Sequence, residues 1–247
     1  MDIATKVIGV IPARYESTRL SHKLLRNLKG KPLIQWTWEA AKEAHQLDEL
    51  IIACDHSELK NCAESFGAQV VLTSPAQPSG TDRIAEAVSD LDVKIVVNIQ
   101  ADEPLIHPSI IDNLVQEMLA NPDISMTTAK TRIDQDQEIN NPNAVKVVCD
   151  KDGWAIYFSR FAIPYYRGQS TDRNYYKHLG IYAYTKDFLY TFKNLEPSAL
   201  EKAEKLEQLR VLESGYRIKV IETKFNSWGV DTEEDLQQVE RILIEGK

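Results

Sequence analysis

The residues Val-Lys-Ile-Val-Val-Asn-Ile, at positions 93–99, give the strongest strand signal in this chain of 247 residues. Apolar, mostly β-branched side chains run through the segment without the polar alternation of a half-exposed strand, a pattern typical of a parallel strand buried on both faces. Helical patterns stand on either side, at 82–91 and at 108–120. Pro108 suits a helix N-terminus, and Asn121-Pro122 ends the second pattern. A strand between two helices predicts βα units.

The same alternation extends toward the N-terminus. Residues 6–13, 49–54 and 68–73 are short apolar runs of strand length, and helical patterns at 33–44 and 56–66 separate them. Repeated βα units imply a mainly parallel sheet with helices on both faces, so we expect an α/β fold. In such open sheets, ligands bind beyond the carboxyl ends of the strands, and the loops that follow each strand should carry the chemistry.

The second half of the chain has a different pattern. A hairpin is predicted around Asp150-Lys151-Asp152-Gly153, and Thr232 is a candidate N-cap for a final helix. We expect one domain over residues 1–247, whose halves, 1–130 and 131–247, share one sheet and enclose a cleft. The remaining predicted elements are strands at 146–149, 154–158, 178–184 and 217–222 and a helix at 203–212.

Composition excludes several classes of function. The formal net charge is −8, which argues against general binding of nucleic acid, because that requires a basic surface. No apolar run approaches the roughly 20 residues that span a bilayer, and the N-terminal residues lack a signal-peptide pattern, so membrane insertion is not expected. The three cysteines are odd in number and not spaced for zinc, and the five histidines form no metal-binding pair. These features predict a cytoplasmic protein.

A cluster of positive charge follows the first predicted strand. Within residues 14–31, six basic side chains are opposed only by Glu16, and Ser17 and Thr18 add hydroxyl donors. A cationic loop at the carboxyl end of a first parallel strand is suited to hold phosphate groups, although a solvated basic face would give the same pattern. The six residues are Arg14, Arg19, Lys23, Arg26, Lys29 and Lys31.

The common nucleotide-binding loops are absent from this position. No G-x-G-x-x-G follows the first strand, and no G-x-x-x-x-G-K-[ST] sequence occurs. Gly30-Lys31 is followed by Pro32, which lacks the N–H group that a phosphate-binding loop would need. Dinucleotide-binding and Walker-type sites are therefore not predicted.

Two carboxylates are candidate ligands for a divalent cation. Asp102 follows the strand at 93–99, and Asp231 lies at a strand-to-helix junction where an aspartate also serves as a helix cap. Carboxylates hold Mg²⁺ through one or two oxygens, while water and substrate phosphates complete the octahedron. The two residues are 129 positions apart (231 minus 102), so only the fold could bring them together.

Seven blocks of sequence, in order along nearly the whole chain, resemble the 3-deoxy-manno-octulosonate cytidylyltransferases, the CMP-Kdo synthetases of lipopolysaccharide synthesis. Each block alone is weak evidence, whereas all seven together are specific. The blocks are VIGVIPARYESTRL (7–20), SGTDRIAE (79–86), VVNIQADEP (96–104), YFSRFAIPY (157–165), KHLGIYAY (177–184), LEQLRVLESGY (206–216) and GVDTEEDL (229–236).

The resemblance implies a nucleotidyltransferase fold, a homodimer and a Mg²⁺-dependent reaction. In that reaction CTP and the sugar acid Kdo give CMP-Kdo and pyrophosphate, by attack of the anomeric C2 hydroxyl on the α-phosphorus. By resemblance, Arg14 and Lys23 would bind the triphosphate, and Asp102 and Asp231 would hold Mg²⁺; these four are the expected catalytic residues. The resemblance further places Ala13, Ser79, Gly80 and Arg83 beside the nucleotide and Gln100, Arg160, His178 and Glu207 beside the sugar acid.

The chain departs from the family pattern at three places. Ser21-His22 replaces the usual Pro-Gly before Lys23, Ala101 replaces a glycine, and Gln77 replaces a histidine two residues before the SGTDR block. These changes bear on substrate preference, and a Kdo derivative such as the 8-amino form, or a sialic-type acid, stays open as the substrate. A non-catalytic nucleotide-binding regulator is the alternative from another class. A glycosyltransferase is disfavoured because no D-x-D motif lies in the right place.

Overall fold

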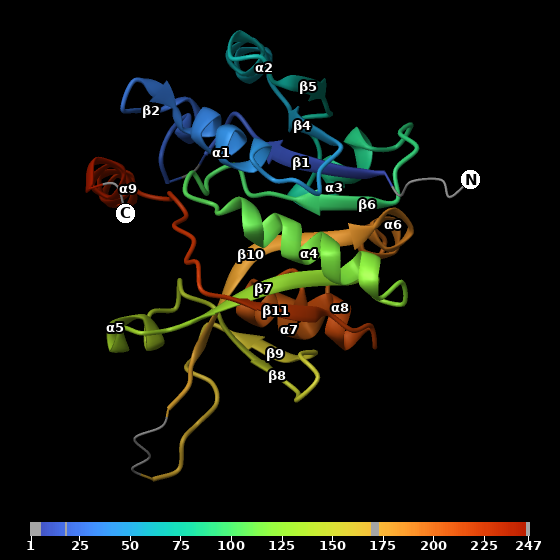
Figure 1. Ribbon diagram of the computed structural model, residues 1–247, viewed down its shortest axis with the longest axis vertical. Helices are drawn as coiled ribbons and strands as arrows, with labels where there is room; N and C mark the ends of the chain where they lie inside the picture. Colours follow the sequence, from blue (N-terminus) through green and yellow to red (C-terminus); the bar gives the residue numbers. More distant parts are fainter. Residues whose placement is uncertain (1–5, 18, 169–172, 246–247) are drawn as a thin grey trace.

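A computed structural model describes residues 6–17, 19–168 and 173–245 (Figure 1). In this part of the chain, nine strands form one sheet in the order β11-β7-β10-β6-β1-β4-β5, with β8 paired to β10 and β9 paired to β8. The short strands β2 (Asn27–Leu28) and β3 (Lys31–Pro32) form a separate hairpin. The strands of the sheet are β1 (Val7–Ala13), β4 (Glu49–Cys54), β5 (Gln69–Leu72), β6 (Ile95–Asn98), β7 (Met126–Arg132), β8 (Lys146–Cys149), β9 (Ala155–Ser159), β10 (Tyr176–Thr185) and β11 (Lys219–Thr223).

The sheet is mixed but mainly parallel, as predicted. Strands β6, β1, β4 and β5 run parallel, and β11 runs parallel to β7. Strand β10 is antiparallel to both of its long neighbours, with Tyr182 opposite Asn98 and Thr185 opposite Ile95. Because β10 is reversed, its middle, at Tyr182, lies opposite the last residue of β6, and its first residues extend beyond that edge to pair with β7 and β8.

Helices cover both faces of the sheet. On one face lie α1 (Leu33–Lys42), α2 (Ser57–Ser65), α4 (Pro108–Ala120) and α9 (Glu233–Glu245). Helix α4 contacts β6, β10 and β7 and runs along the strands in front of β10 in Figure 1. The opposite face packs against α3 (Gly80–Ala87), α6 (Lys186–Lys193) and α8 (Leu209–Glu213). Three further short helices complete the described chain: η1 (Lys23–Leu25), α5 (Asp136–Ile139) and α7 (Ala199–Glu204).

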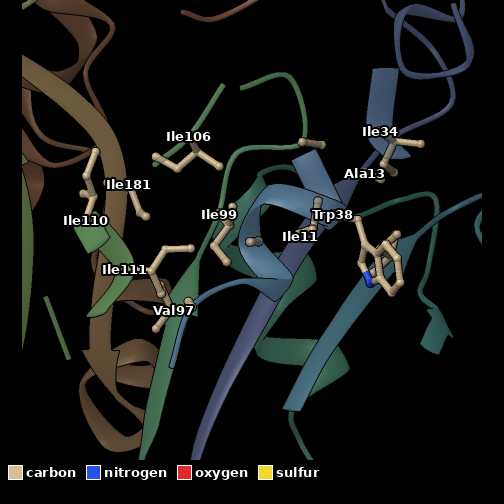
Figure 2. Packing of buried hydrophobic residues seen from close by; sticks show 14 of the residues in the cluster. Ile11, Ala13, Ile34, Trp38, Val97, Ile99, Ile106, Ile110, Ile111 and Ile181 are labelled. Carbon is tan, nitrogen blue, oxygen red and sulfur yellow. The ribbon is translucent and has the colours of Figure 1, made fainter. Parts of the chain in front are cut away.

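Strand β1 shows why both faces must be covered. Its side chains alternate between two hydrophobic clusters, with Ile11 and Ala13 in the cluster under α1 and α4 and Ile8 and Val10 in the cluster under α3. All four are fully buried. Figure 2 shows the first cluster, in which isoleucines of the sheet meet Ile111 and Trp38 from the helices.

Most of the predicted elements of the first half are present within a few residues. Strand β4 and helix α4 have the predicted bounds, and the helix predicted at 82–91 is α3, which begins two residues earlier and ends at Ala87. The helix predicted at 203–212 is wrong. The chain forms α7 and α8 there, separated at Lys205, whose φ of 54° belongs to a left-handed conformation that ends a helix. Strand β7 and helix α6 were not predicted.

The connection between β9 and β10 extends away from the body of the molecule (Figure 1). The Tyr166 hydroxyl joins its two limbs, accepting from the Asn174 N–H at 2.9 Å and donating to the Asn174 carbonyl at 3.1 Å. Phe161 and Tyr165 are 79% and 88% exposed on this arm, which we define as residues 160–168 and 173–175.

Within the described residues, no helix combines the length and the apolar character that a bilayer span requires.

Two residues of α4 provide a matched test of core packing. Ile111 is fully buried, whereas Leu119 is 42% exposed on the same helix. We expect Ile111→Ala to lower the free energy of unfolding by about 2–5 kcal/mol, because it removes buried methyl groups and leaves a cavity. Leu119→Ala should cost less than about 1 kcal/mol. Urea unfolding of both variants checks this, and equal losses would contradict the packing described.

Candidate active site

A polar cleft of about 450 Å³ opens at the edge where β1 and β6 end. Its walls come from the basic loop after β1, the start of α3, the turn after β6 and the segment that leads into α9. Of the predicted site residues, the cleft brings together Arg14, Lys23, Ser79, Gly80, Arg83, Gln100, Asp102 and Asp231, and Pro12, Ser17, Arg19, Leu20, Leu24, Gln77, Pro78 and Ala101 complete its lining. Thr18 lies outside the described residues.

The two predicted cation ligands converge on one point, and the Lys23 ammonium occupies it. Its Nζ donates to Asp102 Oδ2 at 2.6 Å and to Asp231 Oδ1 at 2.9 Å. Burial opposes the charge on Lys23, but the two carboxylates outweigh it and raise the pKa of this lysine, which is therefore fully protonated at neutral pH. Arg19 adds a second positive charge, 2.8 Å from Asp231 Oδ2.

Backbone hydrogen bonds hold the two carboxylates in this position. The Val230 N–H donates to the Asp102 carbonyl at 2.9 Å, which joins the two segments directly beside both side chains. From α1, the fully buried Thr37 hydroxyl donates to the Ala101 carbonyl at 3.0 Å. These two bonds hold the main chain that carries the aspartates, and neither depends on which cation lies between the carboxylates.

The turn before Lys23 explains one departure from the family pattern. His22, at the position where the resemblance leads us to expect glycine, has a φ of 49°, a left-handed conformation that glycine adopts without strain. Its ring lies 4.3 Å from that of Tyr15, and Tyr15 stacks on His56 at 3.9 Å. The turn keeps the backbone that a glycine would favour, and the tilted ring contact with Tyr15 packs the bulkier side chain.

Arg14 and Arg83 have different surroundings in the cleft. Arg14 is exposed, and no ion pair joins it to another described residue, so its guanidinium is available to a ligand. Arg83 is 4% exposed and donates to Asp55 Oδ2 at 3.0 Å and to Thr73 Oγ1 at 2.6 Å. Arg83 therefore lines the cleft as part of a fixed hydrogen-bond network.

Asp55 is a site-supporting residue that the sequence reasoning missed. Its second oxygen accepts the Tyr15 N–H at 2.8 Å, so one carboxylate joins the basic loop to Arg83. Asp55 directly follows β4, and the rule that selected Asp102, a carboxylate at the carboxyl end of a parallel strand, would also have selected Asp55.

The N-terminus of α3 faces the cleft. Ser79 is its N-cap, and the serine hydroxyl accepts the Asp82 N–H at 3.1 Å. Gly80 lies against β1, since a Cβ there would be 3.5 Å from Pro12 Cγ. Ala13 is fully buried between the lining residues Pro12 and Arg14, so only its backbone could meet a ligand. The N-terminal N–H groups of a helix favour a negatively charged group nearby.

The other two departures also lie in the cleft lining. The Gln77 amide donates to Glu86 Oε2 at 2.5 Å, and the same carboxylate accepts the Ser74 N–H, so Gln77 is held toward α3. Ala101 is 6% exposed beside Asp102. Gln100 donates to Asn98 Oδ1 at 3.3 Å, which orients its amide at the end of β6.

Glu207 lies just outside this cleft, in the break between α7 and α8. It lines a neighbouring hollow of about 740 Å³ that shares Pro78 and Ser79 with the cleft. The Thr81 hydroxyl, from α3, donates to Glu207 Oε2 at 2.9 Å. Burial raises the pKa of Glu207, and the hydrogen bond from Thr81 partly offsets this.

The structure does not bring Arg160 or His178 into the cleft lining. The Arg160 guanidinium donates to the carbonyls of Glu204 (2.7 Å), Pro142 (2.9 Å) and Lys205 (3.3 Å), which are backbone contacts that hold the base of the arm. His178 is 8% exposed on β10, and its Nε2 lies 2.9 Å from the Thr128 hydroxyl. Their predicted roles toward the sugar acid stay predictions.

The donor set at Asp102 and Asp231 favours a hard cation. Within the described residues, no group of three or more His, Cys, Asp or Glu side chains is placed to hold a metal ion. A zinc site with three or four protein ligands is therefore not formed by these residues. Two carboxylates in an open polar cleft suit a cation that takes its other ligands from water and substrate phosphates.

Comparisons with known proteins show which family the chain is similar to. The Cytidylyltransferase family profile matches residues 8–220. The chain is 49% identical, over 96% of its length and 94% of the relative's, to a 3-deoxy-manno-octulosonate cytidylyltransferase from Solibacter usitatus. It is 46% identical to the Fusobacterium nucleatum enzyme of the same name, with 97% and 98% of the two chains covered.

Solved structures support the fold independently. A CMP:2-keto-3-deoxy-manno-octonic acid synthetase in complex with CTP superposes with a TM-score of 0.93 at 36% identity, covering 98% of this chain and 100% of the other. A nucleotidyl transferase from Methanothermobacter thermautotroptrophicus matches with a TM-score of 0.66 at 15% identity, over 98% and 99% of the two chains, which shows a shared fold.

The protonation state of His178 can be tested directly. Burial lowers the pKa of His178 to about 3, whereas an unfolded histidine titrates near about 6.5. Between about pH 6.5 and about pH 3, the unfolded chain binds a proton at this histidine that the folded chain does not bind. Lowering the pH through this window therefore lowers the free energy of unfolding by up to about 1.4 kcal/mol per pH unit, whereas above about pH 6.5 His178 has no such effect. We expect the His178 ring signals in an NMR titration to stay constant from about pH 8 to about pH 5. A midpoint inside that range would contradict the described burial.

Proposed function

The chain belongs to the 3-deoxy-manno-octulosonate cytidylyltransferases, and on that premise we infer that it transfers the cytidylyl group of CTP to Kdo and releases pyrophosphate. One observation carries the inference. The cleft holds, in one place, two converging carboxylates and two cationic side chains, Arg14 and Lys23, at the carboxyl ends of parallel strands. This is the charge arrangement that phosphoryl transfer needs for positioning and for charge stabilisation.

The reaction forms one O–P bond and breaks another. The anomeric C2 hydroxyl of Kdo attacks the α-phosphorus of CTP, and the bond to the β-phosphate oxygen breaks with the departure of pyrophosphate. We propose direct in-line transfer, without a covalent intermediate on the protein. Arg14 and Lys23 would then bind the triphosphate and the leaving pyrophosphate through their positive charges.

The nucleotide would lie along the start of α3. Ser79, Gly80 and Arg83 line that wall, and Ala13 contributes backbone beneath it. Sugar contacts would come from Gln100, at the end of β6, and from Glu207, across the Ser79 backbone in the neighbouring hollow.

Mg²⁺ fits the aspartate pair. Asp102 and Asp231 both reach one cation position, as their contacts with Lys23 show, and both remain partly open to the cleft, with side chains 28% and 43% exposed. When bound there, Mg²⁺ would supply positive charge for the reacting phosphate.

Three unpaired cysteines are also consistent with a cytoplasmic setting, where thiols stay reduced.

The decisive experiment is a pyrophosphate-release assay with CTP and Mg²⁺ and a panel of sugar acids: Kdo, its 8-amino derivative and a sialic acid. We expect the largest kcat/KM with Kdo and no release when the sugar is omitted. Preference for the 8-amino derivative would correct the substrate and leave the reaction unchanged. No release with any sugar would favour the non-catalytic regulator.

The aspartates are expected to be essential for turnover. Asp102→Asn and Asp231→Asn should each lower kcat by about a thousandfold, equivalent to ~4 kcal/mol of transition-state stabilisation, because each removes a charged ligand. Circular dichroism should show an intact fold. Asp92→Asn is the matched control, since Asp92 is exposed and precedes β6, at the opposite edge of the sheet, and its rate should be unchanged. A near-normal rate for Asp231→Asn would reduce that residue to a helix cap.

A homodimer is the proposed assembly, and the arm between β9 and β10 is its proposed contact. Phe161 and Tyr165 are the most exposed large apolar side chains among the described residues, and they lie on one projecting segment. We expect light scattering to give twice the 28.1 kDa chain mass for the wild type and the chain mass for a Phe161→Ser, Tyr165→Ser variant. Leu119→Ser, on α4, should remain dimeric. A dimeric double variant would place the interface elsewhere.

A further inference from the structure

Lys23 and a divalent cation compete for the same pair of carboxylates. The lysine ammonium lies 2.6 Å from Asp102 and 2.9 Å from Asp231, and the lysine side chain is only 12% exposed. A Mg²⁺ ion bound by both carboxylates would need oxygen atoms at about 2.0–2.1 Å. The ammonium and the metal ion therefore cannot occupy the position together, and their like charges oppose close approach.

Of the two partners, the lysine is the one that can move. The backbone bond from Val230 to Asp102 fixes the main chain beside both aspartates, and an aspartate side chain is short, so its carboxylate stays close to this position. Lys23 reaches them through a flexible four-carbon stem from the short helix η1. A rotation of that stem would free the pair without altering the strands around it.

A triphosphate offers the displaced ammonium a new partner. Lys23 lines the same cleft as Arg14, in the loop at the end of β1. Phosphate oxygens accept strong, charge-assisted hydrogen bonds from lysine. A bound triphosphate would therefore draw Lys23 from the aspartates and, at the same time, supply further oxygen ligands to a metal ion.

We propose that Lys23 acts as an internal counter-ion that makes metal binding at Asp102 and Asp231 conditional on the nucleotide. Without nucleotide, Lys23 offsets one of the two negative charges of the pair, beside the contact of Arg19 with Asp231, and keeps the affinity of the pair for divalent cations low. With nucleotide, the lysine turns to the phosphates and the metal ion takes its place. The proposal rests on the CTP-dependent function inferred above, and it adds an order of events. By linkage, the metal ion must strengthen nucleotide binding by the same factor as the nucleotide strengthens metal binding.

The test measures metal binding in the absence of nucleotide, so it does not depend on turnover. Mn²⁺ serves as the probe, and electron paramagnetic resonance of the free ion gives its Kd for each protein. Lys23→Met keeps the length of the side chain and removes its charge. We expect this variant to bind Mn²⁺ about tenfold more tightly than the wild type, within the range typical of coupled sites. Lys23→Gln should behave in the same way and takes its place if the methionine variant fails to fold.

Two controls locate the effect. Lys31→Met removes a lysine of the same basic segment that pairs with Glu39 at 2.6 Å, and its Mn²⁺ affinity should equal that of the wild type. A Lys23→Met, Asp231→Asn double variant should lose the gain, because the metal ion would have lost one of its two carboxylates.

Three results would overturn the proposal: unchanged Mn²⁺ affinity in both Lys23 variants, an equal gain in Lys31→Met, or a gain that survives in the double variant. Failure of the proposed function would appear separately, as the absence of pyrophosphate release from the wild type. An active wild type whose Lys23 variants bind Mn²⁺ no better would therefore reject the counter-ion role alone.

Discussion

The arrangement of this cleft depends on holding two negative charges close together. Asp102 and Asp231 come from loops 129 residues apart in sequence (231 minus 102), yet both contact a single ammonium group. Two carboxylates that contact the same ammonium group are close enough to repel one another when no cation lies between them. Partial burial strengthens this repulsion. The surrounding structure resists it through the Val230–Asp102 backbone bond and the Thr37–Ala101 bond, both of which act on the main chain. The sheet brings the two carboxylates together, because Asp102 lies in the turn after β6 and Asp231 lies in the segment after β11.

Elements that bury apolar side chains on a regular period could be predicted from the sequence. Strands β1 and β4 and helix α4 are such elements, and their predicted positions match the structure closely. The principle that strand ends carry ligands then led to Arg14, Lys23 and Asp102, all of which line the cleft. Asp231 needed the fold, because its local sequence is equally that of a helix start.

Strand β7 was missed because its burial does not depend on apolar residues. Its sequence is Met-Thr-Thr-Ala-Lys-Thr-Arg, and Thr127, Thr128 and Thr131 are all buried. The Thr128 hydroxyl donates to the carbonyl of Ile181 at 2.8 Å, which removes the cost of burying it. A search for runs of apolar residues therefore does not predict this strand. The surroundings of Arg160 could not be predicted from the sequence either, because its three partners are backbone carbonyls, which no side-chain pattern reveals.

Strand β10 lies behind the sugar side of the cleft, where a Cβ on Gly180 would be 3.8 Å from Gln100 Cγ. It hydrogen-bonds to β6 on one side and to β7 on the other, and it also meets β8, so its backbone is ordered before any ligand arrives. A sugar acid bound at Gln100 would meet a surface that this ordered backbone supports, so little conformational entropy of the protein would be lost on binding. The phosphate side is built from long side chains, of which Arg14 is exposed, and ordering one such chain costs up to about 2 kcal/mol. Sugar recognition would therefore depend on shape, whereas nucleotide affinity would carry an entropic cost that varies with temperature.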